Sequence, residues 1–494
     1  METLWSAALF GAVSATTVML ERRVRSKAGT KHMTPEETES RHILLRHLSN
    51  SSKWSNYSED LEEFIRDLPK VELHVHLDGS FDPNVLWQFL QPSPDAAAAQ
   101  CFPVSMTPPW EPSTTLPLRE HVSACSSPRD YHELCTCRGQ YSLSAMMNRF
   151  QYFLPLVQSH LDRIERLAFD FCARQREQHV VYTEVRYSPH LLLSESDATV
   201  TADDVVQAVT RGLRRGCATY HVTVQQILCA ISWRPEWALP TLELALAYRE
   251  NDGSSTHSCG FVVGVDIAAG EEHFLQDGNS NDNLIMAQRA HAAGIPITLH
   301  AGEVPEGGAQ HIQQAVLQYH AQRIGHGYRM VDDDSDANAV TVQLVKDHQV
   351  HVEVCPTSSV ETGGWKFEGQ RQRGKNWKEH PAVAMHRAGM SVSLNSDDPA
   401  VFHTSLGWQY RIAMAKMGFS KADLVRMNLE AIAASFCKET MKEEMRKRLK
   451  AFARLRAPGW SSDGRDDNDM PSPKPHEGFM DRVYIGHADG EVYT

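Results

Sequence analysis

The sequence predicts an α/β fold, a (β/α)8 TIM-type barrel, and three observations lead to this prediction. Eight short runs rich in β-branched residues alternate with longer segments of helical periodicity between residues 60 and 455. Eight is the number of strands in such a barrel. Side chains capable of chemistry follow the C-terminal ends of these runs, which converge on one face of a barrel. A doubly wound open sheet is the alternative, and the gathering of these side chains favours the barrel.

The predicted strands are KVELHVHL (70–77), VVYTEVRY (180–187), QQILCAIS (225–232), FVVGVDIA (261–268), ITLHAG (297–302), RIGHG (323–327), VHVEVCP (350–356) and SVSLNSD (391–397). Between them, segments such as 162–178 and 202–217 carry apolar residues at spacings of three and four. We expect these segments to form helices that pack by one face.

The chain of 494 residues has the composition of a globular protein, with 41% hydrophobic and 22% charged residues. This composition excludes a fibrous chain, a fully disordered chain and a polytopic membrane protein. Acidic residues outnumber basic ones by 62 to 49, for a net charge of −13, so nucleic acid is not an expected partner. Ten scattered cysteines without a CxxC pair indicate free thiols in a reducing compartment, and we therefore expect a cytoplasmic protein.

Both ends of the chain are expected to lie outside the barrel. Residues 1–22 contain an apolar, uncharged stretch, 4–20, which is followed by a basic cluster. A membrane anchor, a signal peptide and an extension without a targeting role stay open for it, so membrane-anchored and secreted forms are alternatives. Residues 23–59 predict a polar linker with one short helix at 38–49, and residues 457–494 predict a disordered tail.

The barrel itself is expected over residues 60–456. Its longest excursion, 91–140, contains several prolines and predicts a surface insertion, for which the role of a lid stays open.

The first predicted strand carries His74 and His76 on one face, because residues two apart in a strand point to the same side. In a barrel that face is the interior. His300 in the fifth strand and Asp397 in the eighth can supply a third and a fourth ligand. Three imidazoles and one carboxylate suit Zn²⁺, whereas Mg²⁺ would need more oxygen ligands. The pattern therefore predicts a mononuclear zinc site at the C-terminal ends of the strands.

Zinc lowers the pKa of a bound water to about 7, and a reaction of that water needs proton carriers close by. Glu303 follows His300 by three residues and is placed to hand a proton to a substrate. His326, in the sixth predicted strand, is placed to take a proton from the water. Asp397 and Asp398 are consecutive and point in different directions, so that one can bind metal while the other faces the substrate.

Six motifs in order along residues 60–455 make the sequence similar to the adenosine deaminase family of metal-dependent purine deaminases. They are PKVELHVHLDGS (69–80), VVYTEVRYSPHLL (180–192), HAGE (300–303), RIGHGY (323–328), CPTSS (355–359) and SLNSDDP (393–399). The resemblance implies a hydrolase of purine metabolism that holds one zinc ion per chain through His74, His76, His300 and Asp397. It also implies that Glu303 protonates the purine N1 and that His326, with Asp397, orients and deprotonates the attacking water. Adenosine would then become inosine and ammonia.

The resemblance also implies contacts to the substrate. Asp398 would contact the purine N7, and Asp78 would contact the ribose hydroxyls. His76 would contact the substrate as well. After the fourth strand the family usually reads Asp-Leu-Ala-Gly, whereas this chain has Asp-Ile-Ala-Ala-Gly. Either Ala269 or Gly270 would therefore make the backbone contact to N3. An apolar stripe at helical spacing resembles the family's flap over the pocket and consists of Leu143, Met146, Met147 and Phe150.

Adenosine, together with 2′-deoxyadenosine, is the expected substrate, and the oligomeric state stays open. Adenine deaminases commonly carry an aspartate in the sixth-strand motif where this chain has Gly325, which favours the nucleoside over the free base. AMP is disfavoured, because Asp78 would repel its phosphate and the motif offers no arginine or lysine. A catalytically silent purine-binding or signalling protein on the same scaffold is the alternative from another class, although Glu303 and His326 are both present.

Overall fold

The computed structural model describes residues 59–91, 101–249, 259–271, 282–305, 308–332, 335–365, 376–457 and 460. The predicted apolar segment 4–20, the linker helix at 38–49 and nearly all of the tail 457–494 lie outside these residues. Among the described helices, none is both long enough and apolar enough to cross a membrane.

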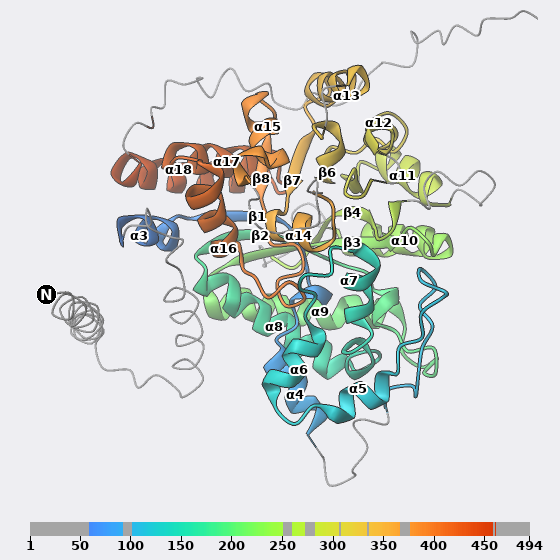
Figure 1. Ribbon diagram of the computed structural model, residues 1–494. Helices are drawn as coiled ribbons and strands as arrows, with labels where there is room; N and C mark the ends of the chain where they lie inside the picture. Colours follow the sequence, from blue (N-terminus) through green and yellow to red (C-terminus); the bar gives the residue numbers. More distant parts are fainter. Residues whose placement is uncertain are drawn as a thin grey trace, which may run out of the picture. The chain divides into compact units, whose positions relative to one another are not determined.

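In the described part of the chain, eight strands form the centre of the fold, one for each predicted run (Figure 1). They are β1 (Lys70–His76), β2 (Val180–Tyr187), β3 (Thr223–Ile231), β4 (Val262–Ala268), β5 (Thr298–Ala301), β6 (Arg323–His326), β7 (His351–Val354) and β8 (Val392–Leu394). Several predicted runs extend past the C-terminal end of the strand, because their last residues belong to the loops that carry the candidate site. The predicted α/β fold is confirmed.

The strands pair in parallel as two four-stranded sheets, β1 to β4 and β5 to β8, each in chain order. Two bridges join the sheets: Val265 of β4 pairs with Ile297 beside β5, and Val75 of β1 pairs with Asp397 beyond β8. At the second bridge, the backbone N–H of His76 donates to the carbonyl of Asp397 at 2.8 Å. The ring is thereby closed into a barrel, as the sequence predicts, and is not an open sheet.

Helices lie around the strands (Figure 1). They are α3 (Glu59–Asp67), α4 (Pro83–Leu90), α5 (Leu118–Ala124), α6 (Pro128–Cys135), α7 (Leu143–Phe150), α8 (Leu161–Glu177), α9 (Ala202–Tyr220), α10 (Ala238–Tyr248), α11 (Asp282–Ala292), α12 (Gly308–Leu317), α13 (Asp336–Asp347), α14 (Pro356–Glu361), α15 (Pro381–Arg387), α16 (Leu406–Ile412), α17 (Lys421–Ala434) and α18 (Glu439–Arg456). α8 and α9 match the predicted helical segments, and each buries one apolar face. A capping box between Thr201 and Asp204 starts α9.

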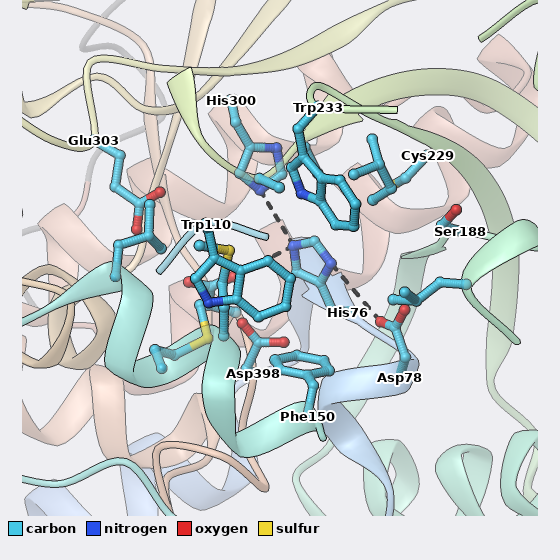
Figure 2. Close-up of a pocket in the computed structure, with 18 of the residues that line it drawn as sticks. His76, Asp78, Trp110, Phe150, Ser188, Cys229, Trp233, His300, Glu303 and Asp398 are labelled. Carbon is cyan, nitrogen blue, oxygen red and sulfur yellow. Dashed lines mark hydrogen bonds and ion pairs between the residues drawn. The ribbon is translucent and has the colours of Figure 1, made fainter. Parts of the chain in front are cut away.

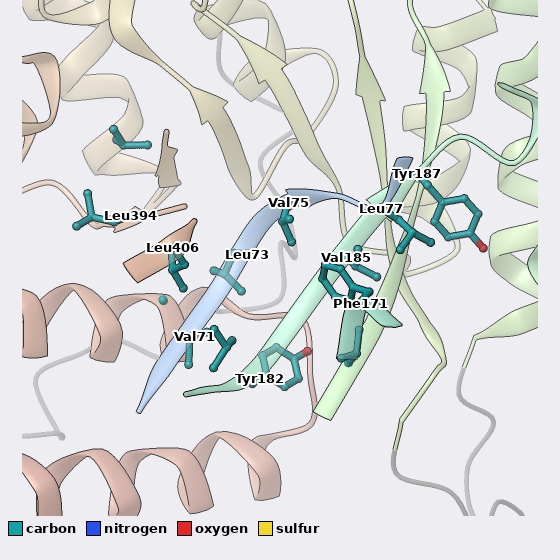
Figure 3. Close-up of a cluster of buried hydrophobic side chains, with 14 of the residues drawn as sticks. Val71, Leu73, Val75, Leu77, Phe171, Tyr182, Val185, Tyr187, Leu394 and Leu406 are labelled. Carbon is teal, nitrogen blue, oxygen red and sulfur yellow. The ribbon is translucent and has the colours of Figure 1, made fainter. Parts of the chain in front are cut away.

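Apolar side chains along β1 anchor the strand that carries the first two histidines. Val71, Leu73 and Val75 are at most 1% exposed and alternate with His74 and His76 along the strand (Figure 3). This period-two alternation separates the side chains that pack into the hydrophobic core from those that point to the candidate site.

The described part of the predicted insertion, residues 101–140, packs against the barrel. Tyr131 and Cys137 are 0% exposed, and the backbone N–H of Cys137 donates to the carbonyl of Val401 at 2.8 Å. Met106 and Leu116 pair as an isolated antiparallel bridge. This packing brings a residue of the insertion, Trp110, into the wall of the candidate pocket.

Candidate active site

Five side chains meet at the C-terminal ends of the strands. His74 and His76 belong to β1, His300 to β5 and His326 to β6, and Asp397 follows β8. Potential ligand atoms of His74, His300, His326 and Asp397 all lie within 4.8 Å of one another, and His76 forms a second such group with Asp397 and its neighbour in sequence. Nε2 of His76 lies 3.2 Å from Nε2 of His300 (Figure 2). The structure thus brings together the four predicted ligands and adds His326 to their cluster.

The donor atoms of this cluster fit a zinc ion. Nε2 of His74 is buried, has no hydrogen-bond partner in the described part of the chain and lies 3.2 Å from Oδ1 of Asp397. Burial lowers the pKa of His76 well below its ordinary value, so that its imidazole is neutral and able to ligate. Burial would raise the pKa of Asp397, but its close contacts with the imidazoles of His74, His326 and His76 hold this pKa well below its usual range. Imidazole nitrogens beside one carboxylate oxygen form a ligand set that suits Zn²⁺.

Two buried carboxylates behind the histidines set the direction of the imidazoles. Nδ1 of His74 lies 2.8 Å from Oε2 of Glu353, and Nδ1 of His300 lies 3.0 Å from Oδ2 of Asp266. The guanidinium of Arg186 joins these carboxylates, at 2.7 Å from Glu353 and 2.9 Å from Asp266. Carboxylates that accept from Nδ1–H leave the Nε2 lone pairs facing the cluster. No role for Glu353 or Arg186 could be predicted from the sequence, because no local motif marks this pairing between strands.

We expect Glu353→Gln to weaken metal binding roughly 10- to 100-fold, because the partner of His74 Nδ1 would lose its charge. Competition with a chelator measures this affinity. Glu430→Gln is the matched control: Glu430 is also a buried carboxylate, but it accepts from the backbone of Val392 and from Arg426. Equal metal affinities in the two variants would contradict the prediction.

Another buried carboxylate, Glu271, holds Glu303 in place. It accepts from the backbone N–H groups of Gly302 at 2.7 Å, Glu303 at 2.5 Å and Val304 at 3.2 Å, and it lies 2.8 Å from Nδ1 of His311. Burial raises the pKa of Glu303 to about 8, and neighbouring carboxylates act in the same direction. The Glu303 carboxyl is therefore protonated at neutral pH and able to donate a proton. Glu271 also went unassigned in the sequence analysis.

His326 faces Glu303, with 3.6 Å between Nε2 and Oε2. Its Nδ1 lies 3.3 Å from the hydroxyl of Tyr328, which donates its own proton to the carbonyl of Cys355 at 3.0 Å. Tyr328 can therefore only accept from His326, which places the proton on Nδ1 and leaves the Nε2 lone pair open. Burial lowers the pKa of His326 well below its ordinary value, so the imidazole is neutral and able to take up a proton.

Three residues of the site adopt a left-handed backbone conformation, which residues other than glycine rarely adopt. They are Ala269 (φ 75°), His326 (φ 71°) and Asp397 (φ 63°). Such residues cost roughly 1–3 kcal/mol each and cluster at functional sites. Of the two alternatives after β4, Ala269 lies in the pocket wall, whereas the carbonyl of Gly270 accepts from Ser232 Oγ at 2.8 Å outside the set of lining residues.

The cluster opens into a pocket whose wall is formed mainly by apolar and aromatic side chains with a few polar groups, the kind of lining that small-molecule sites have. The predicted flap is helix α7, and all four of its predicted residues, Leu143, Met146, Met147 and Phe150, line this cavity. Asp78, Glu303 and Asp398 line it as well (Figure 2). Every residue predicted for the site therefore lines the pocket or lies in the histidine and aspartate cluster, except Gly270.

Two tryptophans in the pocket wall were absent from the sequence analysis. The rings of Trp110 and Trp233 lie 5.6 Å apart between centroids (Figure 2). Trp110 is held by its Nε1–H, which donates to Oδ1 of Asn148 at 2.9 Å. The insertion thus contributes an aromatic side chain to the pocket. Its proline-rich sequence does not predict this contribution.

Two glycines allow the acidic and imidazole groups to approach closely. A Cβ at Gly79 would lie 1.7 Å from Oδ1 of Asp398, and a Cβ at Gly325 would lie 2.7 Å from Cε1 of His74. Any side chain at Gly325 would therefore displace a candidate metal ligand.

Comparison with known proteins agrees with this geometry. The sequence model of a known family, described as adenosine deaminase, matches residues 109–452. The adenosine deaminase of Mus musculus is 31% identical over 390 residues, which cover 77% of this chain and 96% of that protein.

Solved structures share the fold. Arabidopsis ADAL complexed with IMP has a TM-score of 0.60 at 23% identity, over 79% of this chain and 99% of that one. An adenine deaminase from Arthrobacter aurescens has a TM-score of 0.59 at 20% identity, over 78% and 99%. An amidohydrolase from Burkhoderia ambifaria with bound Zn has a TM-score of 0.58 at 18% identity, over 82% and 97%. From the family match and the identity to the mouse enzyme over most of both chains, we conclude that this chain belongs to the adenosine deaminase family of hydrolases.

Proposed function

We propose that the protein catalyses the zinc-dependent hydrolytic deamination of adenosine, and of 2′-deoxyadenosine, to the corresponding inosine and ammonia. The observation that carries this proposal is the position of Glu303, a buried carboxyl protonated at neutral pH, in the same pocket wall as the histidine and aspartate cluster. A proton donor beside a cluster of potential metal ligands suits a hydrolysis in which a ring nitrogen gains a proton while water adds to the neighbouring carbon. The reaction belongs to purine nucleoside salvage.

His74, His76, His300 and Asp397 would hold the zinc ion, whose identity is supported by the donor set and by the zinc in the Burkhoderia relative of the same fold. When bound, zinc makes a water molecule acidic enough to react at neutral pH. The open Nε2 lone pair of His326 would accept the proton of this water.

Two carboxyl groups would hold the purine. Glu303 would donate its proton to N1, which prepares C6 for the addition of water and the loss of ammonia. Burial, together with the charges of Asp397 and Asp78, raises the pKa of Asp398 well above its ordinary value. Asp398 would therefore donate a hydrogen bond to N7, a ring nitrogen that can only accept.

The lining of the pocket supports a nucleoside substrate over a nucleotide. Among the described residues that line the pocket there is no arginine or lysine, and the acidic side chain of Asp78 is present. A phosphate dianion near Asp78 would meet this carboxylate without a compensating arginine or lysine. The structural relative ADAL was solved with IMP, so AMP is the first competing substrate to test. Adenine is the second, since an adenine deaminase shares the fold.

We expect the rate with adenosine to fall as the pH rises through the pKa of Glu303, which is raised to about 8 by burial. The sign follows from the role: the donor must be protonated, and deprotonation above its pKa removes the proton to be donated. The measurement is kcat/KM from neutral to alkaline pH. The residual activity of Glu303→Gln should lack this decrease at alkaline pH. If the decrease persisted in the variant, it would be due to the titration of a group other than Glu303.

The proposed function is tested by following the ultraviolet absorbance of adenosine, 2′-deoxyadenosine, adenine and AMP mixed separately with the purified full chain, with the metal content measured in parallel. Conversion of the two nucleosides with one zinc per chain is the expected result. Preferential conversion of adenine or AMP would overturn the substrate assignment. Bound zinc without any conversion would favour the silent purine-binding protein.

A further inference from the structure

Three buried oxygen atoms in the pocket wall have no hydrogen-bond partner among the described residues: Oδ1 of Asp398, which the proposed function assigns to the purine, Oγ of Ser188 and Oδ1 of Asp78. Ser188 is 2% exposed and Asp78 is 3% exposed. A buried polar atom without a partner costs roughly 1–3 kcal/mol. Two such atoms in one wall of a pocket indicate that a ligand satisfies them.

The parallel pairing of β1 and β2 brings Asp78 and Ser188 to the same end of two neighbouring strands. His76, the last residue of β1, lies opposite Arg186; Asp78 begins a short 3-10 helix two residues later, and Ser188 directly follows the end of β2. Burial raises the pKa of Asp78 to about 7, while the backbone N–H groups of Ser188 and Gly79 act in the opposite direction by hydrogen bonding to the carboxylate. The main chain of Ser188 therefore already holds Asp78, whereas its side chain is left for another partner.

The surroundings specify the chemistry of that partner. The pocket wall also contains the apolar side chains of Leu191 and Ile231. It contains Cys229 as well, whose thiol stays protonated because burial raises its pKa. Nδ1 of His76 is 3.9 Å from Oδ1 of Asp78, beyond hydrogen-bond distance. Because the described lining residues include no arginine or lysine, an anionic group is unsuitable at this end of the pocket, whereas an alcohol both donates and accepts. Asp78 and Ser188 lie on the opposite side of the pocket from Glu303 in Figure 2.

We propose that Ser188 is a specificity residue: its Oγ and the carboxylate of Asp78 together bind one hydroxyl group of the substrate's sugar. The sugar O–H donates to Oδ1 of Asp78, and the hydroxyl of Ser188 donates to the sugar oxygen. The inference rests on the proposed function, since a nucleoside whose base is held by Glu303 and Asp398 carries its sugar toward this end. It adds to the resemblance a residue, Ser188, for which the motif comparison assigned no contact.

Ser188→Ala tests this proposal with a panel of adenosine, 2′-deoxyadenosine, 3′-deoxyadenosine and 5′-deoxyadenosine. The expected result is a loss in kcat/KM of roughly 3- to 12-fold, the value of one hydrogen bond, with every substrate that retains the recognised hydroxyl. The loss should disappear with the one analogue that lacks it. Thr183→Val is the matched control, because Thr183 lies on β2, is 1% exposed and also has an unpartnered hydroxyl, but does not line the pocket. It should show no dependence on the sugar.

The same loss with all four substrates, or no loss with any, would overturn the proposal. A loss in Thr183→Val with the same sugar dependence would also overturn it. Failure of the proposed function is distinguished by the wild-type protein: if it converts adenine or AMP in preference to all four nucleosides, the substrate assignment fails before the variant is considered. If wild type converts the nucleosides and Ser188→Ala shows no sugar-dependent loss, the role of Ser188 alone fails.

Discussion

Glu303→Gln is expected to retain one zinc ion per chain and to lose roughly 10²- to 10⁴-fold in kcat with adenosine, the contribution of a positioned general acid. Glutamine keeps the shape of the side chain and leaves the Glu271 contacts to the backbone of residues 302–304 intact. It removes only the acidic proton. Because proton donation acts in the transition state, KM should change little while kcat and kcat/KM fall together.

Steady-state kinetics and metal analysis of the same preparation check this result. Glu430→Gln provides the control for replacing a buried glutamate away from the pocket, and it should retain wild-type turnover. Near-normal turnover in Glu303→Gln would remove the assignment of Glu303 as the proton donor. Loss of zinc from this variant would instead give Glu303 a part in holding the metal.

His76→Ala is expected to lose both metal and activity. Nε2 of His76 lies 3.2 Å from Nε2 of His300 and 3.5 Å from Oδ1 of Asp397, so its removal opens one side of the donor set. We expect metal affinity to fall by more than the roughly 10- to 100-fold that loss of an outer-shell partner causes. Metal content after dialysis against a chelator measures the loss.

The outcome also separates two ligand sets that the geometry allows. His326 lies within the same cluster of potential ligand atoms as His74, His300 and Asp397. If His76→Ala kept stoichiometric zinc and His326→Ala lost it, His326 would be the ligand and the proposed base would have to be reassigned. His132→Ala is a control histidine, since His132 stacks on His403 and does not line the pocket.

The barrel could be predicted from the sequence because each strand is marked locally. Seven of the eight predicted runs contain an observed strand, the run 225–232 overlaps β3, which begins two residues earlier, and β2 matches its run residue for residue. The boundaries were less accurate for β7 and β8, whose strands are four and three residues long. There the polar residues that follow the strand, such as Asn395 and Ser396, turn away from the ladder, and composition alone does not place that turn.

The histidines, acids and flap residues of the site were also accessible from sequence. His74 and His76 share a strand face by period two, and the residues of α7 share a helix face by their spacing. Trp110 was missed because its segment reaches the pocket only by packing against the barrel. Ser188 was missed because a single serine after a strand carries no signal until the fold brings it into the same pocket wall as Asp78.

By itself, the sequence determined which residue types stand at the ends of which strands. The candidate metal ligands and proton carriers follow from these positions. Only the tertiary structure decided their orientation and protonation. Arg186 and Glu353 are 167 positions apart in the chain, yet their contact governs the direction of His74. Likewise, the raised pKa of Glu303 results from burial among groups of other strands. The physical reason is that side-chain identity and local periodicity are properties of neighbouring residues, whereas desolvation and carboxylate pairing arise only when distant strands close into one barrel.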